Sequence, residues 1–386
     1  MFKFSKIFFY VALLGSIACS KRAIVLEANK NLDPLPSEKE TLTQAIDPLV
    51  KDQWNMDKLG MQEVWQNNHG LSRRVIVAVL GTGVDYTHED LAGNIYVNNK
   101  EWSTTTPGKQ NAVDRIDNDD NGYVDDFIGY DFVDNDGLPY DKHGSGTAIA
   151  GIIGAVGNNN KGIRGIVPEV SLLPVRFIDG SGQFHLPNLI SAVDYALKMK
   201  ADVILVHTPS HKLGYQSFGG YVEEYAQIER LMLTELIAKI DKAQTPVVLS
   251  AGSSGLNLEK GEDLISVLKR SPNVIVVTSV NESEKRPAIA NFGRQFVETS
   301  APGENVVTTF PGNSYKSFSN TAIAAAHVAG ALALAVNKHF GKIPTKSLLT
   351  AFVNPQASDA IQDLEFETIG GNRLNISKYL SFLDTL

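Results

Sequence analysis

The chain has 386 residues, of which 43% are hydrophobic and 20% charged, and its formal net charge is −8 at pH 7. This composition is that of a globular protein with one large domain or two ordinary ones. The acidic balance argues against nucleic acid as a partner, and the single cysteine excludes a disulfide within one chain.

The first segment has the pattern of a bacterial export signal. Lys3 and Lys6 precede an apolar run at 7–14, and small residues then lead to Cys19. The apolar run is too short for a membrane span, which needs about 20 apolar residues. We therefore expect residues 1–18 to be a signal peptide. Its removal takes away two lysines and no acid, and changes the net charge from −8 to −10.

Cys19 stands where this signal would be cut. The run Leu-Gly-Ser-Ile-Ala-Cys at 14–19 resembles a bacterial lipobox, in which the thiol is lipidated before cleavage, although Ser16 stands where Leu is usual. We expect lipidation of Cys19, a flexible tether over 19–46 and an exported cell-envelope lipoprotein. The alternative is a plain cleaved signal and a secreted protein.

Residues 47–386 are expected to form one domain of alternating strands and helices. Continuous apolar runs of strand length occur at Val75–Leu80, Val203–Val206, 247–249 and 274–277. Helical patterns separate these runs, for example at 189–197, where the spacing of apolar residues places them on one face. Strands alternating with helices favour a parallel sheet that is covered on both faces, which is an α/β sandwich.

Six segments, in order along the chain, carry a resemblance to a known family. They read VAVLGTGVDYTHEDL at 77–91, GSGTAIAGIIGA at 144–155, AGSSG at 251–255, SAPGEN at 300–305, SNTAIAAAHVAG at 319–330 and GGNRLN at 370–375. Together they resemble the subtilisin-like serine proteases, or subtilases. The resemblance covers the chain from about Asp47 onward and implies a three-layer α/β/α sandwich with a mostly parallel central sheet.

The same alignment places unreactive residues at each catalytic position. A subtilase needs a carboxylate, an imidazole, a hydroxyl nucleophile and an amide side chain in the oxyanion hole. The resemblance puts these four roles at four positions of this chain: Gly81, Ser145, Ala322 and Ser253. Glycine has no side chain, alanine no heteroatom, and a serine hydroxyl is not a base near neutral pH. We expect a catalytically degenerate member of the family, a pseudoprotease without catalytic residues.

A further departure concerns the strand that subtilases offer to a peptide substrate. Here that strand runs from Val203 into Pro209, which has no N–H to donate to a peptide. Three histidines lie in or near these motifs. His143 could be a shifted base only if the alignment took an insertion at Gly146, His207 could contact a ligand in the groove, and His327 is expected to be a packed structural residue.

Two calcium sites are predicted. The segment DNDDNGYVD at 117–125 places oxygen ligands at Asp117, Asp119, Asn121 and Asp125 in a calcium-loop spacing. Ile128 replaces the glutamate of an EF-hand, and an Asx-rich turn without metal is the alternative.

The second site is implied by the resemblance alone. Its ligands would be Asp47, Asp90 and Asn159, with backbone carbonyls near Gly157, Lys161 and Ile163, and a solvated turn is the alternative.

The sequence thus predicts a non-catalytic binding or scaffold protein. We expect its partner to be a protein or peptide held at the former active-site cleft, and its only membrane contact to be the lipid anchor. Two rivals stay open. One is an endopeptidase or another hydrolase that uses unrecognised residues, and the other is a purely structural envelope lipoprotein.

Overall fold

The computed structural model describes residues 47–67, 73–101, 103–106, 109–111, 114–208, 211–216, 220–260 and 263–386. The proposed signal peptide, Cys19 and the tether therefore lie outside the described residues, as does Pro209. Within this part of the chain, one helix is long and apolar enough to cross a membrane, Thr321–Lys338, and 89% of its apolar window is buried inside the protein.

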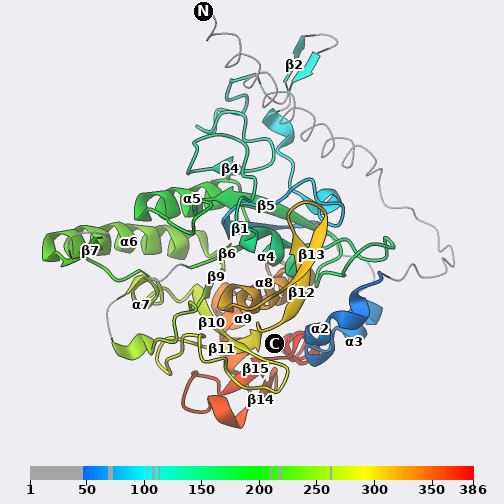
Figure 1. Cartoon of the computed structure of the whole chain (residues 1–386), viewed down its shortest axis with the longest axis vertical. Helices are drawn as coiled ribbons and strands as arrows, with labels where there is room; N and C mark the ends of the chain where they lie inside the picture. Colours follow the sequence, from blue (N-terminus) through cyan, green and yellow to red (C-terminus); the bar gives the residue numbers. More distant parts are fainter. Residues whose placement is uncertain are drawn as a thin grey trace, which may run out of the picture.

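A nine-stranded sheet forms the centre of the molecule (Figure 1). Its strand order is β14-β15-β11-β10-β9-β6-β1-β5-β4, and only the edge pair β14–β15 is antiparallel. The strands are β1 Val75–Gly81, β4 Tyr130–Asp131, β5 Val170–Arg176, β6 Val203–Val206, β9 Val247–Ser250, β10 Val274–Val280, β11 Thr299–Pro302, β14 Ser358–Ala360 and β15 Asn372–Leu374. The four predicted strands are β1, β6, β9 and β10.

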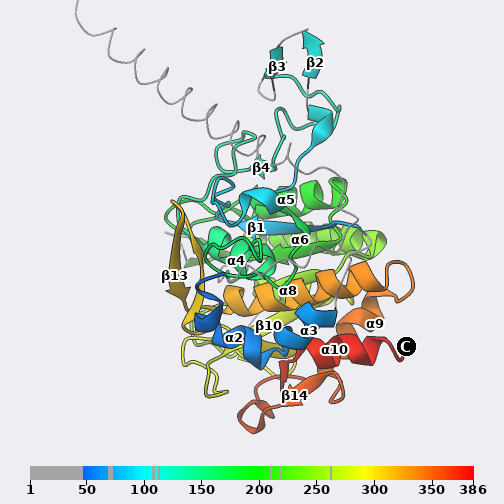
Figure 2. The same ribbon diagram turned by 90° about the vertical axis from the view of Figure 1, so that its right-hand side faces the viewer.

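Helices cover both faces of this sheet. One apolar core contains residues of α2 Trp54–Lys58, α3 Met61–Asn67, α4 Ser145–Gly154, α8 Thr321–Lys338, α9 Thr345–Thr350 and α10 Ile376–Leu383. The other contains residues of α5 Leu186–Lys198, α6 Glu223–Ala243 and α7 Leu264–Leu268. Figure 2 shows α8 with α2, α3 and α10 beside it. The predicted three-layer α/β/α sandwich is confirmed.

The sheet divides its side chains between these two cores. In β1, Val77 and Val79 pack into the first core, and Ala78 and Leu80 pack into the second. Because successive residues of a strand point to opposite faces, a strand covered on both sides must be apolar throughout. This explains why the buried strands read as continuous apolar runs.

In the part of the chain that the structure describes, three antiparallel hairpins lie outside the central sheet. They are β2 Ser103–Thr106 with β3 Lys109–Asn111, β7 Tyr215–Gln216 with β8 Gly220–Tyr221, and β12 Val306–Phe310 with β13 Ser314–Phe318.

Helix α8 is buried along most of its length. It is apolar all round, which is typical of a helix enclosed by protein, and the Asn320 side chain caps it by accepting a hydrogen bond from the Ile323 N–H at 2.9 Å. Capping fixes where the helix begins. The first turn of α8, with Ala322 as its second residue, is therefore held at a defined place beside the sheet.

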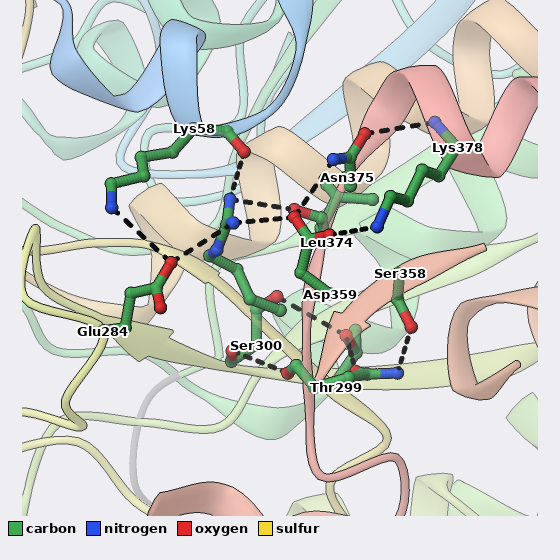
Figure 3. A network of polar contacts seen from close by, with 11 residues as sticks. Lys58, Glu284, Thr299, Ser300, Ser358, Asp359, Leu374, Asn375 and Lys378 are labelled. Carbon is green, nitrogen blue, oxygen red and sulfur yellow. Dashed lines mark hydrogen bonds and ion pairs between the residues drawn. The ribbon is translucent and has the colours of Figure 1, made fainter. Parts of the chain in front are cut away.

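A polar network fastens the C-terminal segment to the rest of the molecule (Figure 3). The guanidinium of Arg373 in β15 pairs with Asp359 at 2.7 Å and with Glu284 at 3.3 Å, and it also donates to the carbonyl of Lys58 in α2. Asp359 in addition accepts from Asn375 and pairs with Lys378. The network joins α2, the segment after β10 and the edge strands β14 and β15.

Candidate functional site

A pocket of about 290 Å³ opens where the carboxyl ends of β1, β6 and β9 face the first turns of α4 and α8. Ligands of open α/β sheets characteristically bind outside the carboxyl ends of the strands. The pocket is lined by Thr82, His143, Ser145, Ile178, Gly182, His207, Thr208, Ser250, Gly252, Ser253, Asn320, Thr321 and Ala322. Three of the four predicted positions, Ser145, Ser253 and Ala322, are among these residues.

The fourth position, Gly81, ends β1 directly beside the pocket-lining His207. A Cβ at Gly81 would lie 3.3 Å from the Cβ and 3.8 Å from the Nδ1 of His207. The imidazole therefore lies next to the space that a side chain at Gly81 would enter. Its Nδ1 is buried and has no hydrogen-bond partner among the described residues.

Ser145 is the first residue of α4 and is buried at the pocket wall. Its Oγ lies 2.9 Å from Nδ1 of the exposed His143, a hydrogen-bonding distance. Gly146, the next residue, has no room for a side chain, since a Cβ there would lie 1.8 Å from the carbonyl oxygen of Gly83. This close approach presses the start of α4 against the loop that follows β1.

The α8 side of the pocket presents a methyl group and two hydroxyls. Ala322 is 1% exposed and lies one residue after Thr321, whose N–H donates to the Oγ of Ser253 at 3.2 Å. The hydroxyl oxygen of Thr321 accepts from the N–H of Gly252 at 2.9 Å. Ser253 thus serves the first turn of α8 as a hydrogen-bond acceptor.

The pocket as a whole is neutral and polar. No Asp, Glu, Lys or Arg is among its lining residues. Burial, and next the charge of His143, lower the pKa of His207 to about 4, so its imidazole is neutral near pH 7. Such a lining can hydrogen-bond a ligand, and its one contact between a hydroxyl and a base is that between Ser145 and His143.

His327 is placed in the apolar core, away from the pocket lining. Its Nδ1 lies 2.8 Å from the carbonyl oxygen of Ile323, and its Nε2 lies 2.8 Å from Nδ2 of Asn55. The carbonyl requires a donor at Nδ1 and the amide an acceptor at Nε2, which makes the ring neutral. Burial lowers the pKa of His327 to about 3.

A cluster of three carboxylates lies in and beside the predicted calcium loop. Glu101, Asp119 and Asp126 bring one oxygen each to within 4.8 Å of one another, and Glu101 and Asp126 are buried. Burial, and next the charge of Asp126, raise the pKa of Glu101 to about 7. Burial likewise raises the pKa of Asp126 to about 6. The Oε2 of Glu101 is buried without a hydrogen-bond partner among the described residues, so this oxygen is free to bind a cation.

The other predicted ligands of this loop have different contacts. Asp117 accepts from the N–H groups of Asn121 and Gly122, and Asp125 accepts from those of Asp114 and Arg115. The Asn121 side chain donates to Asp126. The structure therefore gathers Asp119 with Glu101 and Asp126, two residues that the spacing pattern did not identify.

Asp47, Asp90 and Asn159 also come together. Asp47 accepts from the N–H groups of Asn158 and Asn159, and Asn159 Nδ2 donates to Asp90 at 2.7 Å. Asp90 accepts further from the Ile163 N–H, and burial raises the pKa of Asp90 to about 6. Each of these carboxylate oxygens already accepts a hydrogen bond, unlike the Oε2 of Glu101.

Comparison with known proteins places these features in a family. The model of the subtilase family, Peptidase_S8, matches residues 72–369. The chain is 30% identical over 290 residues to subtilisin-like protease 1 of Plasmodium berghei, covering 72% of this chain and 45% of that protein. It is 28% identical over 282 residues to thermitase of Thermoactinomyces vulgaris, and the match covers 73% of this chain and 81% of thermitase. The chain spans less than half of the Plasmodium protein.

Two solved structures share the fold. A cold-adapted subtilisin-like serine proteinase superposes with a TM-score of 0.56 at 24% identity, covering 80% of this chain and 91% of that chain. The epidermin leader peptide processing serine protease of Staphylococcus aureus superposes with a TM-score of 0.66 at 18% identity. The match covers 86% of this chain and 80% of that chain. The expected family resemblance is confirmed.

Proposed function

The chain belongs to the subtilase family, and within that family we propose that it is a pseudoprotease, a protein that binds a partner at the former active-site pocket without cutting it. One observation carries the proposal. The first turn of α8 offers the pocket a methyl group at Ala322, where the family motif has its nucleophile. No oxygen is present there to attack a carbonyl.

The neighbouring positions support the same function. Gly81 has no carboxylate to orient a base, and the His207 imidazole lies against it. Ser145 cannot take a proton from a nucleophile, because its hydroxyl is not a base near neutral pH. Loss of the serine or histidine alone costs subtilisin about 10⁶ in turnover. Hydrolysis by the family mechanism should therefore be undetectable, while the pocket stays open to a ligand.

A second candidate function rests on the Ser145–His143 contact. A hydroxyl 2.9 Å from an imidazole nitrogen is the contact found between a nucleophile and its base. In this alternative the chain is a hydrolase in which Ser145 attacks and His143 takes the proton. Among the described residues, no third group contacts the His143 ring to orient it, and its side chain is exposed. We therefore favour the binding function.

One experiment separates the two candidates. The purified protein is treated with a fluorescent fluorophosphonate, and labelled peptides are located by mass spectrometry, with Ser145→Ala as the matched control. The binding function predicts no labelling and no cleavage of casein. Labelling of Ser145 that disappears in the control would overturn it in favour of the hydrolase.

We also propose that the protein carries structural calcium. The cluster Glu101, Asp119 and Asp126 would hold one ion, which would neutralise three neighbouring carboxylates and fix the loop at 114–126. Lys198 lies near this loop, donating to the carbonyl of Asn121. Asp47, Asp90 and Asn159 are proposed as the second site. Binding of radioactive calcium by the purified protein tests both sites.

The proposed location is the bacterial cell envelope, with a lipid on Cys19 as the only membrane contact. The support is the lipobox-like run at 14–19, which lies outside the described residues. Mass spectrometry of protein expressed in a bacterial envelope should find Cys19 as the N-terminus, with acyl groups attached. An unmodified N-terminus at a later residue would contradict the lipid anchor. A structural envelope role without a ligand is the remaining rival.

A further inference from the structure

Helix α6 packs unevenly against the protein along its length. Its buried residues are Ala226, Leu233, Leu236 and Ile240. In its first half, at 223–232, all of which the structure describes, Ala226 alone is buried. Packing of an apolar face supplies most of the stability of helices in proteins, and a helix of about ten residues is marginal in water without it. The first half of α6 therefore has a face left for a further contact, and Figure 1 shows α6 at the periphery of the molecule.

This half of α6 exposes large apolar side chains. Tyr225, Ile228 and Leu231 are 51%, 55% and 63% exposed, and Met232 is partly buried. The spacing i, i+3 and i+7 of Tyr225, Ile228 and Met232 places them on one face of the helix, with Leu231 beside them. We call these four residues the α6 stripe. Single exposed apolar residues are common, whereas a contiguous group of them marks a surface that binds something.

Two acidic side chains border the α6 stripe. Glu224 precedes Ile228 by one helical turn and Glu235 follows it by two turns, so both lie on the face of the stripe, one at each end. Both are exposed, and neither has an ion pair in the part of the chain that the structure describes. The nearest bases are paired elsewhere: Arg230 with Glu223 at 3.1 Å, and Lys239 with Asp194 of α5. The stripe therefore ends in unbalanced negative charge on both sides.

These charges select the kind of surface that can cover the stripe. A second copy of the chain would bring the same acids to the interface, and an anionic lipid surface would repel them. Lysine or arginine side chains would instead pair with them. The i, i+3, i+7 spacing is that of the apolar seam by which one helix packs against another, and the charges beside such a seam determine which helix is accepted.

We propose that the α6 stripe docks an amphipathic helix of a partner protein, with apolar residues on one face of that helix and basic residues beside them. None of the residues of the stripe lines the pocket at the strand ends, so this is a second surface. Docking covers the exposed side chains of Tyr225, Ile228 and Leu231 and pairs the partner's bases with Glu224 and Glu235. The proposal does not depend on whether the pocket binds a ligand.

The probes are two synthetic peptides of about three heptads that share one apolar seam. Both have leucine at heptad positions a and d, and both carry fluorescein. One has lysine at positions e and g, and the other has glutamate there, so that like charges keep each peptide from pairing with itself. Each is titrated with the purified protein, and fluorescence polarisation is measured. The lysine peptide should bind roughly tenfold more tightly than the glutamate peptide.

Exchanging the charges tests whether Glu224 and Glu235 select the partner. In the double variant Glu224→Lys with Glu235→Lys the preference should reverse, and the glutamate peptide should bind roughly tenfold more tightly than the lysine peptide. The matched control is Glu282→Lys with Asp363→Lys, which makes the same change in net charge at two exposed positions outside α6. This control should keep the native preference. Reversal in both double variants would show that net charge alone decides binding, and would overturn the assignment to α6.

A second pair of substitutions tests the apolar part of the stripe. Ile228→Gln with Leu231→Gln should weaken binding of the lysine peptide roughly tenfold or more. Glutamine is a good helix former, and both side chains are exposed, so the melting temperature should change little. Hydrogen exchange followed by mass spectrometry locates the contact. Exchange at 223–232 should slow when the lysine peptide binds, and exchange in α4 should stay the same.

Three outcomes would overturn the proposal. The first is that the native protein binds neither peptide, or binds both equally. The second is a dimer of the native protein in sedimentation that Ile228→Gln with Leu231→Gln dissociates, since the stripe would then pair with a second copy. The third is binding to phosphatidylcholine vesicles that the same variant abolishes, which would make a lipid surface the occupant. None of these results concerns the pocket, so the binding function proposed above would stand.

Discussion

The imidazole of His207 lies against the α-carbon of Gly81, at the carboxyl ends of two neighbouring strands of the sheet. A Cβ at Gly81 would be 3.3 Å from the Cβ of His207 and 3.8 Å from its Nδ1. Gly81, the position predicted for the family's carboxylate, and the histidine are therefore neighbours in space. Any side chain restored at 81 must share its space with His207.

The first prediction concerns this pair. Gly81→Asp should place a carboxylate beside the imidazole and raise the pKa of His207 from about 4 by about 1 to 3 units. An opposite charge stabilises the protonated ring, which burial otherwise disfavours. The His207 Hε1 signal is followed by NMR during a pH titration. The isosteric Gly81→Asn, which has no charge, should leave the pKa nearly unchanged, and an equal effect of both variants would contradict this account.

A second prediction is that restoring the family's residues gives little activity. The variant Gly81→Asp, Ser145→His, Ser253→Asn and Ala322→Ser should remain a poor peptidase, because Pro209 still lacks the N–H that pairs with a substrate. His207 would also compete for the restored Asp. Casein hydrolysis is measured with and without Pro209→Gly. Full activity of the fourfold variant alone would show that neither residue impairs substrate binding.

The fold and the pocket positions could be predicted because each leaves a local pattern. Strands β1, β6, β9 and β10 are buried on both faces, and such strands must be continuous apolar runs. The positions Ser145 and Ala322 were identified through the family motifs at 144–155 and 319–330, and each lies in the first turn of a helix. The contact between Gly81 and His207 joins two strands, and no pattern in the sequence relates them.

The carboxylate cluster was found only in part, for the same reason. Asp119 belongs to the loop motif, but Glu101 comes from the turn Asn99–Glu101, which is a separate element. Asp126 directly follows the predicted ligand Asp125, whose carboxylate accepts backbone N–H groups instead. Side-chain direction inside an irregular loop depends on its turns, and spacing alone does not determine it. A long-range contact such as that of Glu101 leaves no periodic signal.

The third prediction is that calcium stabilises the fold through this cluster. If calcium binds the native state at ~10 μM and is present at ~1 mM, the free energy of unfolding rises by about 2.7 kcal/mol per site. Glu101→Gln should lose this gain, because Glu101 Oε2 is the buried oxygen without a partner. Asp117→Asn is the matched control in the same loop and should keep it. If the native chain melts at the same temperature in calcium and in chelator, the site is refuted.

The fourth prediction concerns the C-terminal network of Figure 3. Asp359→Asn should lower the free energy of unfolding by about 2 kcal/mol, since charged hydrogen bonds to Arg373 and Lys378 are lost. Glu284 still pairs with the Arg373 guanidinium and limits the loss. Asp363→Asn, in the short helical turn after β14, is the control and should change stability little. The free energy of unfolding of both variants is measured in urea. Equal values for Asp359→Asn and Asp363→Asn would contradict a stabilising role of the network.

The last prediction is a pH dependence carried by His327. Its pKa is about 3 in the folded protein and about 6.5 in the unfolded chain. The unfolded state therefore binds more protons between these values, and stability falls as the pH decreases from about 6.5 towards 3. When the pH is lowered from 7.5 to 5, this one group lowers the free energy of unfolding by about 2 kcal/mol.

The variant His327→Gln isolates that contribution, because glutamine can hydrogen-bond but does not titrate. It should be less stable than the native chain at pH 7.5, since the contacts with Ile323 and Asn55 are disturbed. Its loss of stability from pH 7.5 to pH 5 should nevertheless be smaller by about 2 kcal/mol. Urea unfolding at both pH values gives the loss of stability between pH 7.5 and pH 5 for the native chain and for the variant. If they are equal, the acid sensitivity arises from other groups, and His327 is already protonated or accessible to water in the folded protein.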